Sequence, residues 1–411
     1  MFLSGDIDPD SAYALINTRF KHYKAREVPK YVYDQTHQIT TPVEERISSK
    51  EAPQLTLGFR FPGAASEEAI MIDAVDMLLA NSTAGLIDIN INQSQKAIGA
   101  YSYTYIRKDY SAHILGGQPN DGETLESLRD LLLLQIDRLK KGDFEEWMLE
   151  AVVNDLKKRE LTSRRSNKHR VSKMSSAFSK EIEWTEQVKY FNKLSAITKA
   201  DLVKFVNKNY HDNYVAVYRT QEENTKSVQV EKPTITPIES PRSNRSEYLL
   251  DFSKNNNPKE IPAVFVEYDQ EIQQGTADHK SKLFYQKNNQ DSLFSLSYVY
   301  PYGTNSDNKL SIAFQYAQLC GTTNSTLSEI NKKWYELGID FTMGVGEEEC
   351  YYSISGLAAN MEKGIKLMQN QLENLKVDSV QMIALKSKII QLRKNSLKNK
   401  RHILWSGLKN Y

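Results

Sequence analysis

The chain has 411 residues, of which 40% are hydrophobic and 26% charged, so it is long enough for two or three compact domains. Its 53 Lys and Arg residues almost balance its 52 Asp and Glu residues, which leaves no overall field to attract nucleic acid or anionic lipid. No apolar run approaches the roughly 20 residues that span a bilayer, and the N-terminus lacks a signal-peptide pattern. We therefore expect no membrane partner, and the compartment stays unknown.

The first 51 residues have the pattern of a domain's end followed by a linker. Residues 2–5 resemble the tail of a strand, and Asp8 before Pro9 predicts the start of a helix. We expect residues 1–24 to be the remnant of a first α+β unit, poorly anchored unless they dock on the next unit. Residues 25–51 have little periodicity and two prolines, which indicates a linker.

Residues 52–220 are predicted to form a complete second α+β unit. Apolar residues alternate along a first strand and then recur at helical spacing, which gives each element one buried face. In chain order we expect a strand over 55–61, a helix capped by Ser66, strands over 85–91 and 97–107, a helix from 125, mostly helical chain over 144–179, a helix opened by a capping box of Thr198 and Asp201, and a closing strand over 213–218.

The same pattern returns further along the chain. Residues 221–280, rich in Pro, Asn and Ser, are predicted to be an extended linker between halves, and residues 281–411 a truncated third α+β unit. Pro62 and Pro301 end matching strands 239 residues apart, and Gly116 and Gly356 close matching hairpins 240 residues apart. A constant offset indicates a duplicated unit. The predicted fold class is α+β, with repeated antiparallel or mixed sheets packed on helices.

Residues that carry catalysis or bind metals are not evident. A hydrolytic zinc site needs two imidazoles one helical turn apart and a nearby carboxylate. No histidine lies within four residues of another; the seven are His22, His37, His113, His169, His211, His279 and His402. The glycine-rich residues 116–123 lack the ending of a phosphate loop, and Cys320 and Cys350 are interpreted as packing residues. We assign no catalytic, metal-binding or cofactor-binding residue, and substrate-binding residues stay unknown.

Two helices are strongly basic, over residues 157–173 and 386–401. Such a surface either binds a polyanion or is simply the solvated face of a helix. Aromatic residues that could stack on bases do not alternate with the charges, which favours the second interpretation. The densest basic run comprises Lys157, Lys158, Arg159, Arg164, Arg165, Lys168, Arg170 and Lys173. A polyanion-binding protein remains an alternative function.

The order of these segments resembles the insulinase/pitrilysin clan of zinc metallopeptidases. The similar segments are FLSGDIDPDSAYALINTRF, PNDGETLESLRDLLLLQIDRLKKGDF, LSAITKADLVKFVNKNYHDNYVAVYR, LSIAFQYAQLCGTTNSTLSEINKKWYELGIDF and SISGLAANMEKGIKLM. The resemblance implies the LuxS/insulinase-like metallohydrolase fold, in which two halves joined by a linker each hold two α+β units and enclose peptides in a chamber.

The sequence departs from that family in the residues that carry catalysis and contact the substrate. The family's H-x-x-E-H motif, in its first unit, would precede Met1. Aligning the third unit on Gly321 places Ile312, Gln315 and Tyr316 where the first unit has His, Glu and His, as in the family's non-catalytic half. The family's substrate-contacting Arg and Tyr would fall after Tyr411. No catalytic residue is carried over.

The resemblance therefore implies an interior piece of a zinc metalloendopeptidase. The parent enzyme would hydrolyse peptide bonds with zinc-activated water, and this piece would supply substrate-chamber wall and hinge without activity of its own. Zinc is expected in the parent or a partner, not in this chain. An alternative is an inactive subunit that requires a zinc-bearing partner chain of the same family. Expected partners are the parent's peptide substrate and either that partner chain or a second copy, with no nucleic acid.

Overall fold

A computed structural model describes residues 1–29, 38–222, 231, 233–236, 244–255, 262–265, 267–277 and 281–408. The chain divides into two compact units, one formed by residues 1–224 and 291–411 and the other by residues 225–290. None of the helices within the described ranges is long and apolar enough to cross a membrane.

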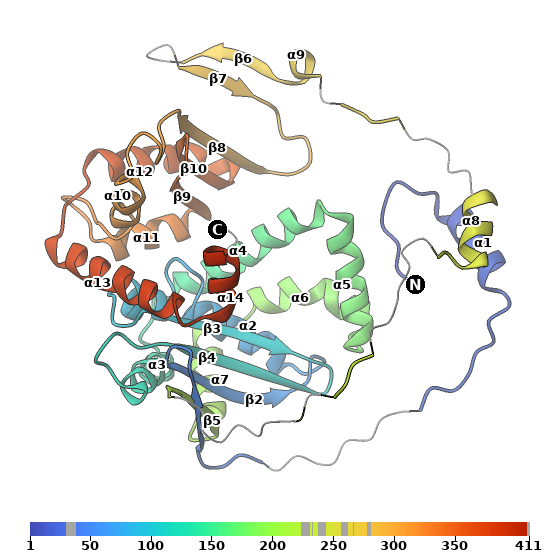
Figure 1. The fold of residues 1–411 in the computed structure, drawn as a ribbon, viewed down its shortest axis with the longest axis horizontal. Coiled ribbons are helices and arrows are strands. Elements are labelled where there is room, and N and C mark those ends of the chain that lie inside the picture. Colours follow the sequence, from blue (N-terminus) through green and yellow to red (C-terminus); the bar gives the residue numbers. More distant parts are fainter. Residues whose placement is uncertain are drawn as a thin grey trace. The chain divides into compact units, whose positions relative to one another are not determined.

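The larger unit contains a five-stranded sheet (Figure 1). Its strands are β1 (Val43–Ser49), β2 (Gln54–Pro62), β3 (Gly99–Ile106), β4 (Tyr110–Gln118) and β5 (Tyr214–Gln221), in the spatial order β1-β5-β2-β4-β3. Only the β1–β5 pair is parallel. Every second residue of β2 from Leu55 to Phe61 is buried, as the alternating pattern predicts.

Helices cover this sheet and supply much of the rest of the main hydrophobic core. They are α2 (Glu68–Leu79), α3 (Leu125–Lys140), α4 (Trp147–Arg164), α6 (Trp184–Ser195) and α7 (Lys199–Asn209). Helix α5 (Asn167–Ser179) packs against α4 and α6. The capping box of Thr198 and Asp201 at the start of α7 is confirmed. Sheets packed on helices confirm the predicted α+β class.

The N-terminal helix α1 (Pro9–Phe20) begins where Asp8 accepts a hydrogen bond from the Ser11 amide, as predicted. None of its residues is buried. The preceding residues contact α5 through Phe2, whose ring lies 5.7 Å from that of Phe178, and through the Ser4 hydroxyl. Residues 2–5 are not a strand, so that expectation was wrong.

The second copy of the repeat has a smaller, antiparallel sheet in the order β8-β10-β9. The strands are β8 (Leu293–Tyr300), β9 (Ile339–Val345) and β10 (Cys350–Leu357), and β10 lies between its neighbours as β4 lies between β2 and β3. The helical elements are α10 (Leu310–Ala317), α11 (Leu327–Glu336), η3 (Ala358–Asn360), α12 (Met361–Glu373), α13 (Ser379–Ser396), α14 (Lys400–His402) and η4 (Ile403–Gly407). Cys320 and Cys350 are both buried, as packing residues should be.

Three other local expectations were wrong. The predicted strand over 85–91 is replaced by a π-helix, η1 (Asp88–Gln93), because the Asp88 carboxylate accepts hydrogen bonds from the amides of Asn81, Ser82 and Gly85 and fixes a turn there. Ser66 does not cap α2, which starts at Glu68 without a side-chain cap. The predicted linker 25–51 contains β1, whose side chains are almost all exposed and therefore show no alternating pattern.

The smaller unit is built from short elements. Helices α8 (Glu247–Asn255) and α9 (Tyr268–Glu271) precede a hairpin of β6 (Gln273–Thr276) and β7 (Lys282–Tyr285). The range predicted as an extended linker therefore contains regular structure that its Pro, Asn and Ser content did not indicate.

Gly116 of β4 provides a test of how closely the strands of the sheet are packed. A Cβ atom on Gly116 would lie 2.6 Å from the Leu55 carbonyl oxygen and 2.6 Å from the Tyr101 hydroxyl oxygen, whereas a Cβ on Gly99 would meet no atom within 4 Å. We expect Gly116→Ala to lower the free energy of unfolding by about 1–3 kcal/mol, because strand spacing must change. Gly99→Ala should stay within about 0.5 kcal/mol. Urea unfolding followed by circular dichroism measures both, and equal midpoints would contradict this packing.

Candidate functional site

The helix after the first strand of each copy corresponds to the helix that carries the zinc motif in the first unit of the family resembled. The 239-residue offset aligns Asp73 with Ile312 and Asp76 with Gln315. The sequence reasoning missed both aspartates, although the offset and their position on an otherwise apolar helix could have identified them. Helix α2 therefore carries carboxylates one turn apart at the position where the family's first unit has its His and Glu.

Asp73 is held in a partly buried polar contact between helix and sheet. Its Oδ1 accepts a hydrogen bond from the Thr104 hydroxyl of β3 at 2.9 Å, and its Oδ2 accepts one from the Tyr190 hydroxyl of α6 at 3.0 Å. Burial raises the pKa of Asp73 to about 6, and these two hydrogen bonds oppose the rise. Burial also raises the pKa of Tyr190 far above its usual value, so Tyr190 stays a hydrogen-bond donor.

Asp76 belongs to a second network one turn along α2. The Ser102 hydroxyl donates to Asp76 Oδ1 at 2.5 Å and lies 2.7 Å from His113 Nε2. The same His113 nitrogen is 3.3 Å from Asp76 Oδ1, while Nδ1 lies 2.6 Å from the Tyr210 hydroxyl. Burial raises the pKa of Tyr210 well above its ordinary value.

The residue types of this network are those of a hydrolytic triad, but its geometry is not. A triad requires the nucleophile on one imidazole nitrogen and the orienting carboxylate on the other. Here Ser102 and Asp76 meet the same nitrogen of His113, and the ring is completely buried. The arrangement can stabilise the packing of α2 on the sheet, but it cannot pass a proton from serine to a substrate.

Zinc does not fit these positions. In the described part of the chain, no group of three or more His, Cys, Asp or Glu side chains could hold a metal ion. The carboxylates of Asp73 and Asp76 are already bound by protein donors. In the second copy Ile312 offers no ligand atom, and the Tyr316 hydroxyl donates to the Asp378 carbonyl oxygen at 2.7 Å and accepts from the Asp378 amide at 2.6 Å.

The other histidines are scattered. His169 lies 3.9 Å from Glu160, and His211 Nε2 lies 2.9 Å from the Lys208 carbonyl oxygen. The ring of His22 contacts Tyr23. His402 lines a cavity near the C-terminal helices. His37 and His279 lie outside the described residues.

The basic run is largely neutralised by ion pairs. Lys158 is buried between Asp155 at 3.0 Å and Asp340 at 2.8 Å, which ties α4 to β9. Arg165 pairs with Asp291, two residues before β8, through its Nε and a terminal nitrogen, each at 2.7 Å. These cations stabilise the junction of the two copies.

Further along the run, one carboxylate collects several cations. Glu160 pairs with Arg164 at 2.8 Å and with Lys173 at 2.6 Å. In the second basic helix, burial lowers the pKa of Lys388, and Lys398 donates to Gln221 at 3.0 Å. The ion pairs therefore interrupt the row of cations in the first segment, residues 157–173.

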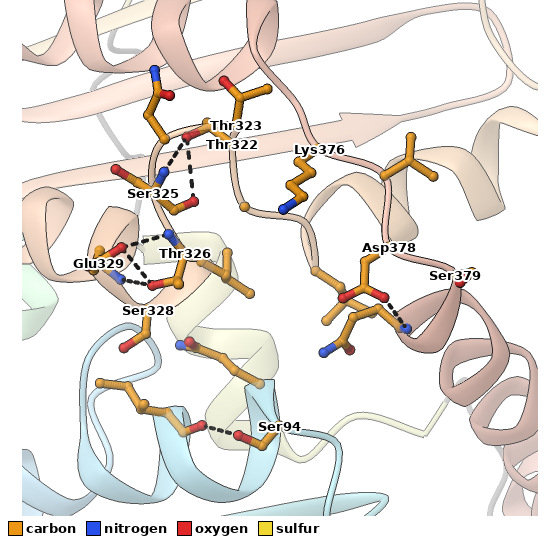
Figure 2. Close-up of a pocket in the computed structure, with 18 residues that line it drawn as sticks. Ser94, Thr322, Thr323, Ser325, Thr326, Ser328, Glu329, Lys376, Asp378 and Ser379 are labelled. Atoms are coloured by element: carbon orange, nitrogen blue, oxygen red, sulfur yellow. Dashed lines mark hydrogen bonds between the residues drawn. The ribbon is translucent and has the colours of Figure 1, made fainter.

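A polar cavity of about 690 Å³ lies where η1 meets the starts of α11 and α13 (Figure 2). Figure 2 shows hydroxyl groups around it and a single cation, Lys376. Its polar groups are largely engaged: the Ser325 amide donates to the Thr322 hydroxyl, and Glu329 completes a capping box with Thr326. The cavity therefore offers small polar contacts and no activated nucleophile.

A second cavity, of about 550 Å³, adjoins Asp73 and Tyr190. Its walls come from α2, α4, α5 and α6 and combine apolar side chains, such as Ile70, with the paired charges of Glu160 and Lys173. This lining can bind a side chain of mixed character, but it does not assemble a catalytic group.

The pH dependence of stability tests the Asp73 contact. The folded-state pKa of about 6 exceeds the ordinary 3.8, so the stability that Asp73 contributes is full below about pH 4 and is lost as pH rises through 6. Asp73→Asn cannot ionise, so between pH 4 and pH 7.5 its stability should shift relative to wild type by at most about 3 kcal/mol in the variant's favour. Urea unfolding at both pH values measures this. The exposed Asp121→Asn is the control, and an equal shift in that variant would contradict the assignment.

Comparisons with known proteins show what part of this chain resembles. Residues 1–156 match the family model described as the Peptidase M16 inactive domain. A search of curated protein sequences finds no match.

Among solved structures, a protease from Helicobacter pylori is 16% identical, with a TM-score of 0.50 over 53% of this chain and 54% of that one. The periplasmic protease PqqL from Escherichia coli is 14% identical, with a TM-score of 0.44 over 95% and 46%. The ferredoxin protease FusC, crystallised with Arabidopsis ferredoxin, is 13% identical, with a TM-score of 0.45 over 96% and 47%. The chain thus spans about half the length of these structures. The resemblance to the insulinase/pitrilysin clan is confirmed by the match of residues 1–156 to the Peptidase M16 inactive domain.

Proposed function

We propose that this chain is a non-catalytic part of a zinc metalloendopeptidase of the insulinase/pitrilysin clan. The zinc-bearing part of that enzyme hydrolyses the peptide bond, and this chain supplies wall and hinge of the chamber that holds the peptide. It binds no catalytic zinc and cleaves no peptide alone.

The observation that carries the proposal is the use made of Asp73 and Asp76. A catalytic metal needs ligands whose lone pairs face an open position for water. These carboxylates instead accept hydrogen bonds from Thr104, Tyr190 and Ser102 inside the domain. A metal that displaced these donors would leave the Thr104, Tyr190 and Ser102 hydroxyls without their acceptors, which costs about 1–3 kcal/mol for each. The site is therefore built for packing.

Two forms of the proposal differ in where the zinc lies. In the first, the zinc motif is on the same polypeptide as this segment, and in the second it is on a separate partner chain that this inactive subunit must join. The gene separates them: an H-x-x-E-H sequence in frame upstream of the Met1 codon supports the first, and one in a neighbouring reading frame supports the second.

The proposal predicts a protein without bound zinc or peptidase activity. Purified in zinc-containing buffer and then desalted, the chain should hold far less than stoichiometric zinc by elemental analysis, because its described residues assemble no ligand set. Quenched fluorescent peptides should stay intact. Stoichiometric zinc together with cleavage that a chelator abolishes would overturn the proposal.

The alternative of a polyanion-binding protein predicts that the basic run over residues 157–173 binds nucleic acid tightly, whereas we expect only weak binding. Because Arg165 is paired with Asp291 and Arg164 with Glu160, we expect duplex DNA to bind more weakly than about 10 µM at physiological salt. Reversing the charges of Arg164, Arg165 and Lys168 should leave that weak binding unchanged in fluorescence anisotropy. Micromolar binding that falls steeply with salt and disappears in the reversed variant would favour the alternative. Lys168→Glu alone, which disturbs no ion pair in the described structure, controls for unfolding.

A further inference from the structure

The cavity of about 550 Å³ between α2, α4, α5 and α6 has the size of a small-molecule site. All four helices belong to the larger unit, and α6 contacts each of the other three (Figure 1). Apolar side chains form much of the wall and include those of Ala64, Ala69, Ile70, Leu156 and Phe191. The cavity is therefore a candidate site for a ligand that is partly apolar.

Two buried polar atoms of residues on this wall lack a hydrogen-bond partner among the described residues. They are the hydroxyl oxygen of Ser66 and Nε2 of His169. The Glu160 carboxylate lies 3.9 Å from this Nε2, which is too far for a hydrogen bond. A buried polar atom without a partner is unfavourable, which indicates a partner from outside the chain.

The charges on the wall favour an anion as that partner. Both glutamates of the wall, Glu160 and Glu186, are already paired with two cations each. Asp73 accepts a hydrogen bond on each of its oxygens. Lys180, which follows α5, has no ion pair among the described residues, although its charge acts on Asp73. The unmatched groups are therefore an ammonium, a hydroxyl and an imidazole nitrogen, all of which can donate to an acceptor.

The start of α2 adds to this preference. This helix of 12 residues begins without a side-chain cap, and Ala65, Ser66 and Ala69 around its start line the cavity. The first amides of a helix have no intrahelical acceptor and lie at the positive end of the helix dipole, where an anion is stabilised. The acidic residue of the first turn, Glu68, does not line the cavity.

We propose that this cavity binds a small organic carboxylate with an apolar body. The Lys180 ammonium and the Ser66 hydroxyl hold the carboxylate, with His169 Nε2 as a further donor, and the body lies against Ile70 and Leu156. A free acid and the C-terminal carboxylate of a peptide with an apolar last residue share this chemistry. The inference does not rest on the proposed peptidase role, because one unit of this chain supplies every group.

Two other kinds of ligand fit the wall less well. Inorganic phosphate would match the donors but would gain nothing from the apolar side chains. An amine would have to use Asp73, whose oxygens already accept hydrogen bonds, and it would leave Lys180 and Ser66 unmatched.

The test titrates the whole chain with phenylpropionate and with the alcohol and the amine that share its body, phenylpropanol and phenylpropylamine. N-acetylglycylphenylalanine and its C-terminal amide test the peptide source. Ligand-observed NMR gives the dissociation constants, and hydrogen exchange followed by mass spectrometry shows whether residues 64–73 and 169–193 become protected. Lys180→Gln removes the proposed cation, and Lys168→Gln, an exposed lysine of α5 that does not line the cavity, is the matched control.

We expect phenylpropionate to bind with a dissociation constant of about 0.1–1 mM and to protect both segments, and the alcohol and the amine to bind roughly tenfold more weakly or worse. Lys180→Gln should weaken phenylpropionate binding roughly tenfold, and Lys168→Gln should leave it unchanged. Tighter binding of N-acetylglycylphenylalanine than of phenylpropionate, lost in the amide, would support a peptide as the source of the carboxylate. The reverse order would support a free acid.

Three results would overturn the proposal. The first is binding of neither carboxylate, the second is equal or tighter binding of the alcohol or the amine, and the third is protection confined to other parts of the chain. The comparison of acid, alcohol and amine on the wild-type chain keeps the test decisive if Lys180→Gln does not fold.

Discussion

Two partly buried carboxylates on one helix, those of Asp73 and Asp76, constrain the rest of the larger unit. Charge can be removed from water only if hydrogen-bond donors replace it. For Asp73 and Asp76 those donors come from β3 and α6, and His113 of β4 links the network to Tyr210 after α7. The helix layer and the sheet are therefore fixed to each other by polar contacts at the place where a catalytic relative would need an open metal site.

The duplication explains why the two copies share a set of strands and a helix. The copies differ in the strands that are added to this shared set. Each copy has a strand between two antiparallel neighbours and a following helix, with a glycine where backbones approach closely. A Cβ on Gly356 would lie 2.3 Å from the Gly338 carbonyl oxygen, as a Cβ on Gly117 would lie 2.5 Å from the Gly99 carbonyl oxygen. The first copy adds β5 and β1 beyond this shared set, and the ion pairs of Lys158 and Arg165 attach the second copy to it.

The sequence was most informative where local chemistry decides structure. The alternation in β2 and the capping box of Thr198 and Asp201 depend on neighbouring residues, and both were predicted correctly. β1 was missed because its side chains face solvent and its pairing partner, β5, lies more than 160 residues away. The strand expected over 85–91 failed because one carboxylate, that of Asp88, reorganised the turn before it. The polar network was missed because its partners come from four separate segments, and a single sequence shows no sign of their meeting.

The most direct test of the account is diffraction from crystals of the chain grown with excess zinc, recorded on both sides of the zinc absorption edge. We predict no anomalous peak within bonding distance of Asp73, Asp76 or His113, because both carboxylates already accept hydrogen bonds and the His113 ring lies between Ser102 and Tyr210. A peak bound by any two of these side chains would contradict it.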